Sequence, residues 1–152
     1  EVELYIEFMR LAIMQAIKAE PSNNTFSTGV LLVNGTTLIS EGHTRETGTP
    51  EKHAAECAIL KAQNGKQWRL LPKSTMYTTM EPCSSTLVSK VPCTTHIINA
   101  GIAKVVIGVK EPEFFDNCKG VETLCAAGID VVHLKILQEE CLVTNKHLLT
   151  DP

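Results

Sequence analysis

Short segments without polar alternation are separated by helix-like segments through the second half of the chain. Residues 74–80, 104–109 and 129–134 read STMYTTM, KVVIGV and IDVVHL, and each is typical of a short strand. The helix-like segments between them end at Gly101 and Gly128, and glycine commonly ends a helix. Strands of this kind, separated by helices, indicate a sheet that is covered on both faces. The pattern predicts parallel strands joined by helices.

The first half of the chain predicts a helix, a hairpin and a second helix. Residues 3–19 form a helix-like segment whose apolar residues at helical spacing are Leu4, Phe8, Leu11 and Ile17. Two apolar runs flank Asn34-Gly35, the dipeptide that best fits a type I′ turn, because both central positions need a positive φ. A helix follows at about 51–65. The expected order is αββαβαβαβα: an α/β fold of three layers, in which helices cover both faces of a five-stranded mixed sheet with an initial hairpin.

The composition excludes several classes of function. With 152 residues, of which 43% are hydrophobic, the chain is long enough for one core, so we expect residues 1–152 to form a single domain. The formal net charge of −3 gives no basic surface for long nucleic acids. No segment approaches the roughly 20 apolar residues that span a bilayer, and the N-terminus is acidic where a signal peptide is basic. We expect a cytoplasmic protein with a small-molecule partner and no membrane partner.

One histidine and two cysteines could together hold a metal ion. His53 lies at the predicted start of a helix, and Cys83 and Cys93, each directly after a proline, flank the loop before the next helix. Catalytic zinc sites use three protein ligands plus water, and one His with two Cys is a known set. Alone, such a histidine is more often a cap or surface residue, and such a cysteine is more often packed in the core. The conjunction of the three favours zinc.

Long stretches around these three residues resemble a known enzyme family. Residues 76–113, MYTTMEPCSSTLVSKVPCTTHIINAGIAKVVIGVKEPE, and CAAGIDV at 125–131 are similar to the deaminase domain of riboflavin biosynthesis, within the cytidine deaminase superfamily. SEGHTRETGTPEKHAAECAIL at 40–60 resembles the end of that family's hairpin and its zinc-binding helix. Nine residues separate Cys83 from Cys93, which resembles the riboflavin branch, whereas nucleic-acid deaminases usually have two. The chain shows no following reductase segment, which resembles the fungal-type, stand-alone arrangement.

The resemblance implies a fold, a cofactor and a reaction. The fold is cytidine-deaminase-like, and zinc is held by His53, Cys83 and Cys93. In such enzymes a zinc-activated water attacks a ring carbon, and a glutamate passes a proton to the departing amine. The implied substrate is a 2,5-diamino-6-(ribosylamino)- or 2,5-diamino-6-(ribitylamino)pyrimidinone 5′-phosphate, which loses its 2-amino group as ammonia, and the fungal-type arrangement favours the ribityl compound. The resemblance also implies a homodimer.

The residue that should carry the proton is missing. The family's motif has glutamate two positions after the histidine, and this chain has Ala55 there. Glu56 projects about 100° around the helix from that direction, so we do not expect it to reach the same water. Three explanations stay open: Glu56 acts through an altered helix start, the chain is a natural pseudoenzyme, or the glutamate has been replaced. We favour replacement, because glutamate at position 55 restores HAEECAIL, a typical family segment.

Polar residues in three loops are candidates for substrate contacts. In the family, an asparagine before the first strand and polar residues after the hairpin hold the base and sugar, which implies Asn24, His43 and Glu46. Asn24 is equally well explained as a turn-forming residue. Between the cysteines, Lys90 lies near a family basic residue that contacts the substrate phosphate. Ser85 stands where the family has a histidine.

Two other functions stay open at this point. One is a nucleoside, nucleotide or tRNA deaminase of the same superfamily, against which the wide cysteine gap and the acidic charge argue. The other is a non-catalytic protein with a structural zinc ion, which Ala55 taken at face value would support.

Overall fold

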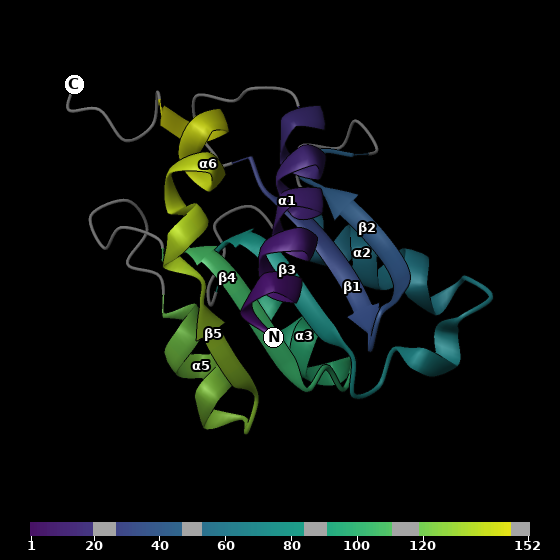
Figure 1. The fold of residues 1–152 in the computed structure, drawn as a ribbon. Helices are drawn as coiled ribbons and strands as arrows, with labels where there is room; N and C mark the ends of the chain where they lie inside the picture. The colour runs from purple at the N-terminus through teal and green to yellow at the C-terminus, as the bar shows by residue number, and fades with distance from the viewer. Residues whose placement is uncertain (20–26, 47–52, 84–90, 111–118, 147–152) are drawn as a thin grey trace.

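The computed structural model describes residues 1–19, 27–46, 53–83, 91–110 and 119–146 (Figure 1). The α-helices are α1 (Val2–Lys18), α2 (Ala54–Gln63), α3 (Cys93–Asn99), α5 (Gly120–Ala126) and α6 (Gln138–Leu142). The strands are β1 (Gly29–Asn34), β2 (Thr37–His43), β3 (Thr75–Met80), β4 (Lys104–Val109) and β5 (Asp130–His133). Short 3₁₀ turns are η1 (Trp68–Leu70), η2 (Lys135–Leu137) and η3 (Val143–Asn145). Helices and strands follow the predicted order.

The five strands form one mixed sheet in the order β2-β1-β3-β4-β5. β1 is antiparallel to both of its neighbours, β2 and β3. β3, β4 and β5 are parallel to one another, and Tyr77, Val106 and Val132 are paired across them. The predicted mixed sheet with an initial hairpin is confirmed.

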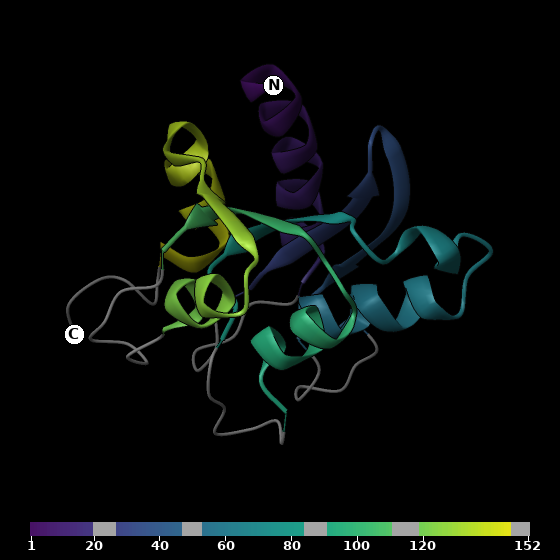
Figure 2. The same cartoon turned by 90° about the horizontal axis from the view of Figure 1, so that it is seen from below.

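Helices cover both faces of the sheet, which makes three layers (Figure 2). α2, α3 and α5 pack on one face of the sheet. Every second residue of a strand, such as Val30 and Leu32 of β1, belongs to the hydrophobic cluster between these helices and the sheet. α1 and α6 pack on the other face, against Leu31 and Val33. Successive residues of a strand point to opposite faces of the sheet, and both faces are covered by a core. Apolar residues therefore follow one another along the strands without polar alternation. No helix in the described ranges has the length and apolar character needed to cross a membrane.

The hairpin forms, but its turn differs from the predicted one. Asn34 is paired with Thr37, so the two central residues of the turn are Gly35 and Thr36. Gly35 has a φ of +64°, and Thr36 does not have a positive φ. A type II′ turn needs glycine at its first central position, whereas a type I′ turn needs a positive φ at both. The predicted type I′ turn centred on Asn34-Gly35 is wrong, because an irregularity in the β1–β2 register keeps Asn34 within the strand.

α1 approaches the sheet closely through small residues, and some of its large apolar residues remain exposed. Ala12 and Ala16 are buried, whereas Leu11 and Ile17 are 40% and 61% exposed. A Cβ at Gly29 would clash with the backbone of α1 at Ala12 and Ala16, so helix and strand touch here backbone to backbone. This close approach selects alanine on the inner side of the helix. Of the apolar residues at helical spacing, Leu11 and Ile17 therefore lie outside the core.

Asn145 ties the end of the described chain to the start of β1. Its side chain is fully buried. Its Oδ1 accepts a hydrogen bond from the Ser27 N–H at 2.6 Å, and its Nδ2 donates to the Ser27 carbonyl at 2.9 Å. Buried backbone groups need such partners, and here one amide supplies both.

The variant Asn145→Ala leaves both backbone groups of Ser27 without these partners. We expect it to lower the free energy of unfolding by about 2–4 kcal/mol, because each unsatisfied buried group costs about 1–3 kcal/mol. Urea denaturation followed by circular dichroism measures the change. Asn99→Ala, at an exposed position in α3, is the matched control and should cost less than about 0.5 kcal/mol. Equal small losses in the two variants would contradict the role given to Asn145.

Candidate active site

His53, Cys83 and Cys93 come together at the carboxyl end of β3. His53 directly precedes α2, Cys83 follows β3, and Cys93 is the first residue of α3. The Nδ1 atom of His53 lies 3.1 Å from Sγ of Cys93 and 3.4 Å from Sγ of Cys83. The ligand atoms of the three residues all lie within 4.8 Å of one another. No other group of three such side chains, among the residues that the structure describes, is close enough to hold a metal ion.

The spacing of these atoms suits a tetrahedral zinc ion. Zn–S bonds of about 2.3 Å and Zn–N bonds of about 2.0–2.1 Å place neighbouring ligand atoms about 3.6–3.8 Å apart. The observed nitrogen-to-sulfur distances of 3.1 and 3.4 Å are slightly shorter, as expected where hydrogen bonds hold the three groups together. Three protein ligands leave the fourth position for water. The group can therefore hold a zinc ion and present water to a substrate.

The start of α3 holds the two sulfur atoms in place. The backbone N–H of Cys93 donates to Sγ of Cys83 at 3.3 Å, and the N–H of Thr94 donates to the Cys83 carbonyl at 3.1 Å. The hydrogen bond from the Cys93 thiol, helped by His53, lowers the pKa of Cys83 to about 4. That same interaction, together with burial, raises the pKa of Cys93. The pair thus favours one thiolate at neutral pH, and a cation held by both sulfurs would displace the second proton.

Ala55 is the second residue of α2 and is buried, with an exposed fraction of 5%. It belongs to the same hydrophobic cluster as Cys93. The neighbouring Glu56 faces α3 instead, where its Oε2 lies 3.9 Å from Nε2 of His96. This contact gives Glu56 a partner in the protein. That Glu56 does not reach the reacting water stays a prediction.

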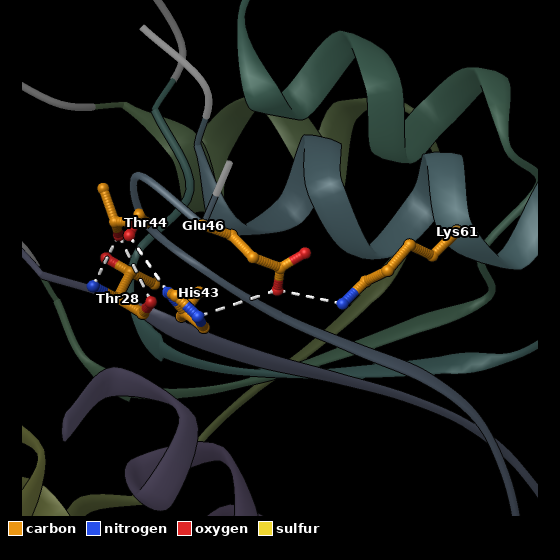
Figure 3. A network of polar contacts seen from close by, with 5 residues as sticks. All are labelled: Thr28, His43, Thr44, Glu46 and Lys61. Carbon is orange, nitrogen blue, oxygen red and sulfur yellow. Dashed lines mark hydrogen bonds and ion pairs between the residues drawn. The ribbon is translucent and has the colours of Figure 1, made fainter. Parts of the chain in front are cut away.

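The end of β2 and the turn that follows it lie against α2. A Cβ at Gly42 would lie 2.7 Å from the carbonyl oxygen of Ala54, so the end of β2 lies directly on that helix. Beyond Gly42, Figure 3 shows Glu46 between His43 and Lys61. Lys61 Nζ donates to Oε1 of Glu46 at 2.9 Å, and Nε2 of His43 lies 3.9 Å from the same oxygen. Two of the residues predicted to contact substrate, His43 and Glu46, therefore lie together.

The other predicted contacts are not placed by the structure. Asn24, Ser85 and Lys90 lie outside the described residues. Lys61, in contrast, is in the structure but is missed by sequence reasoning. Fifteen residues separate it from Glu46, and no local pattern pairs the two.

The family of the chain follows from its sequence as well as from this geometry. Residues 2–109 match the model of the cytidine and deoxycytidylate deaminase zinc-binding region. The chain belongs to this family. The family is described by its zinc-binding region, and the matched residues include His53, Cys83 and Cys93. Zinc is therefore the metal that the family implies for this group. The predicted membership of the cytidine deaminase superfamily is confirmed.

A riboflavin biosynthesis protein RibD from Aquifex aeolicus is 30% identical over 149 residues, which cover 97% of this chain and 39% of the relative. A diaminohydroxyphosphoribosylamino-pyrimidine deaminase from Schizosaccharomyces pombe is 39% identical over 136 residues, which cover 90% of this chain and 33% of the relative. A deaminase/reductase from Thermotoga maritima superposes with a TM-score of 0.81 at 31% identity, covering 98% of this chain and 41% of that one. Aspergillus oryzae Rib2 deaminase, a C-terminal deletion mutant in complex with DARIPP, gives a TM-score of 0.76 at 28% identity, covering 93% and 89%. The chain spans about a third of the S. pombe relative, and the predicted fold class is confirmed.

Proposed function

We propose that this chain carries the zinc-dependent deaminase site for a 2,5-diamino-6-(ribitylamino)pyrimidinone 5′-phosphate of riboflavin biosynthesis, and that Ala55 leaves this site with very low turnover. The observation that carries the proposal is the cluster of His53, Cys83 and Cys93, within 4.8 Å, in a chain of the deaminase family. The name of the S. pombe relative and the DARIPP complex of the A. oryzae protein support a substituted pyrimidine as substrate.

The proposed reaction exchanges an amino group for oxygen. The oxygen of water bonds to the ring carbon that carries the 2-amino group, and the bond from that carbon to the amine breaks. One proton of the water leaves with the amine as ammonia, and the other ends on the neighbouring ring nitrogen. A zinc ion held by the His53–Cys83–Cys93 cluster would supply the acidity that makes water nucleophilic at neutral pH.

Other groups of the protein position a metal ligand, contact the substrate and transfer the proton. The Cys93 N–H and the Thr94 N–H fix the position of Cys83. We assign substrate contacts to Asn24, His43, Ser85 and Lys90, as the resemblance implies, and place Glu46, the fifth residue that the resemblance implies, beside His43. Proton transfer from water to the amine needs a carboxylate at position 55, and the methyl group of Ala55 cannot supply one. The proposed site therefore binds substrate but lacks its proton carrier.

The alternative is a zinc-binding protein without catalytic activity. One observation favours it, namely the alanine at position 55. Two measurements on the zinc-loaded chain separate the alternatives. Calorimetry shows whether the diaminopyrimidine phosphate binds, and ammonia release shows whether it reacts, before and after Ala55→Glu. Binding together with restored release supports the deaminase. Absence of both favours the non-catalytic protein.

We also infer a homodimer that forms through the face of α2 and α3. Leu60 and Ile98 on these helices are 39% and 37% exposed, and two copies would cover them. Light scattering after gel filtration should give twice the chain mass, and the double variant Leu60→Glu/Ile98→Glu should give one chain mass. Met14→Glu, at a 59% exposed position on α1 across the sheet, is the control and should stay dimeric. A monomeric parent chain would contradict the inference.

A further inference from the structure

Both ring nitrogens of His43 face oxygen atoms of the protein itself. Nδ1 lies 3.2 Å from the carbonyl oxygen of Thr44, and Nε2 lies 3.9 Å from Oε1 of Glu46. A carbonyl oxygen only accepts hydrogen bonds, so the contact with Thr44 places a proton on Nδ1. The ring thus lies between the Thr44 carbonyl and the Glu46 carboxylate at the end of β2 (Figure 3).

The backbone that carries this ring is fixed as well. Thr44 is buried. Its Oγ1 accepts from the Thr28 N–H at 2.7 Å and donates to the Thr28 carbonyl at 3.2 Å, while its own N–H donates to that carbonyl at 3.0 Å. Three hydrogen bonds to Thr28, the residue directly before β1, leave Thr44 little freedom. The orientation of the His43 ring therefore depends on what faces it from the other side.

That other side is the carboxylate of Glu46, which Lys61 holds. Lys61 lies on α2, the helix that His53 precedes, and its Nζ is 2.9 Å from the same Oε1 that faces His43. The Glu46 side chain is 19% exposed and that of Lys61 is 46% exposed. The ion pair thus joins the turn after β2 to α2, the helix that begins beside the group of His53, Cys83 and Cys93.

We infer that Lys61 and Glu46 are a positioning pair: they orient His43 for the substrate, and Glu46 does not itself touch the substrate. This inference rests on the proposed function. A ring that is already oriented loses less side-chain entropy when a ligand binds, which strengthens binding.

The competing explanation is a surface ion pair without a functional role, since exposed pairs often contribute little. The two explanations differ in whether the effect of Lys61 depends on His43. A positioning pair acts through the ring, so it has no effect on binding once the ring is removed. A direct contact of Glu46, or a general effect on stability, persists without the ring.

Binding of the diaminopyrimidine phosphate to the zinc-loaded chain, measured by calorimetry, tests this difference. Ala55 helps here, because slow turnover leaves the substrate intact during the titration. We expect Lys61→Met and Glu46→Gln each to raise the Kd about three- to tenfold, and Lys61→Met to change it less than about twofold in the His43→Ala background. Lys110→Met, which breaks the exposed pair with Glu122 at 3.5 Å, is the matched control and should leave the Kd unchanged.

A second measurement reports on the ring directly. The ¹H–¹³C cross-peak of the His43 ring, identified by its loss in His43→Ala, should move or broaden in Lys61→Met and not in Lys110→Met. A Glu46→Gln effect on the Kd that persists in His43→Ala would show direct contact and overturn the inference. An unmoved cross-peak with an unchanged Kd would also overturn it. If the parent chain binds no diaminopyrimidine phosphate, the proposed function fails, and the cross-peak alone then decides whether the pair orients His43.

Discussion

The variant Ala55→Glu is expected to release ammonia from the diaminopyrimidine phosphate about 10²- to 10⁴-fold faster than the parent chain, the range that a positioned general acid–base contributes. Position 55 is the second residue of α2, two residues after His53, and is buried in the cluster that contains Cys93. A carboxylate there would receive a proton from water and deliver it to the leaving amine. An enzyme-coupled ammonia assay on the zinc-loaded proteins measures the difference.

Two control variants separate this role from other effects of adding an acid. Ala55→Gln has nearly the same size as Ala55→Glu but carries no exchangeable carboxyl proton, so it should stay as slow as the parent. Glu56→Gln should change the rate of Ala55→Glu by less than about threefold, because the Glu56 carboxylate faces His96 on α3. A parent chain that turns over at a normal rate, and loses that rate in Glu56→Ala, would show that Glu56 is the proton carrier.

Removal of a sulfur ligand should have the second large effect. We expect Cys93→Ala to weaken zinc binding by at least about 100-fold, since loss of even an outer partner of a metal ligand costs about 10- to 100-fold. Competition with a chromophoric chelator measures the affinity, and metal analysis after gel filtration gives the stoichiometry.

A cysteine outside the cluster provides the control for Cys93→Ala. Cys125→Ala, at an exposed position in α5, should keep the parent's zinc affinity. Loss of the ion should also lower the melting temperature of the parent chain and leave that of Cys93→Ala nearly unchanged, because a metal that binds only the folded state stabilises it. Equal zinc affinity in Cys93→Ala and the parent would exclude Cys93 as a ligand.

The features that could be predicted from the sequence are those with a local pattern. A few neighbouring residues are enough to indicate a strand such as KVVIGV or a helix that ends at Gly101 or Gly128. The order of helices and strands could therefore be predicted from the sequence. The group of His53, Cys83 and Cys93 could be predicted for a related reason. Helix starts and Pro-Cys pairs are visible in the sequence, and the fold brings their segments to one end of the sheet.

The features that could not be predicted depend on pairs of residues far apart in the chain. The buried side of α1 follows from the contact of its backbone with Gly29, which excludes Leu11 and Ile17 from the core. The ion pair of Lys61 with Glu46 joins a helix to a turn, and neither segment shows a pattern that depends on the other. Periodicity reports the environment of one segment and says nothing of which segment lies against it.

The bond between Asn145 and Ser27 has a consequence for the order in which the chain can fold during synthesis. The two residues are 118 positions apart. While a ribosome is still producing α5 and β5, Ser27, two residues before β1, has its backbone N–H and carbonyl without these bonds. Two backbone groups just ahead of the first strand therefore gain these partners only after Asn145 has been made, so a nascent chain cannot complete this part of its fold segment by segment.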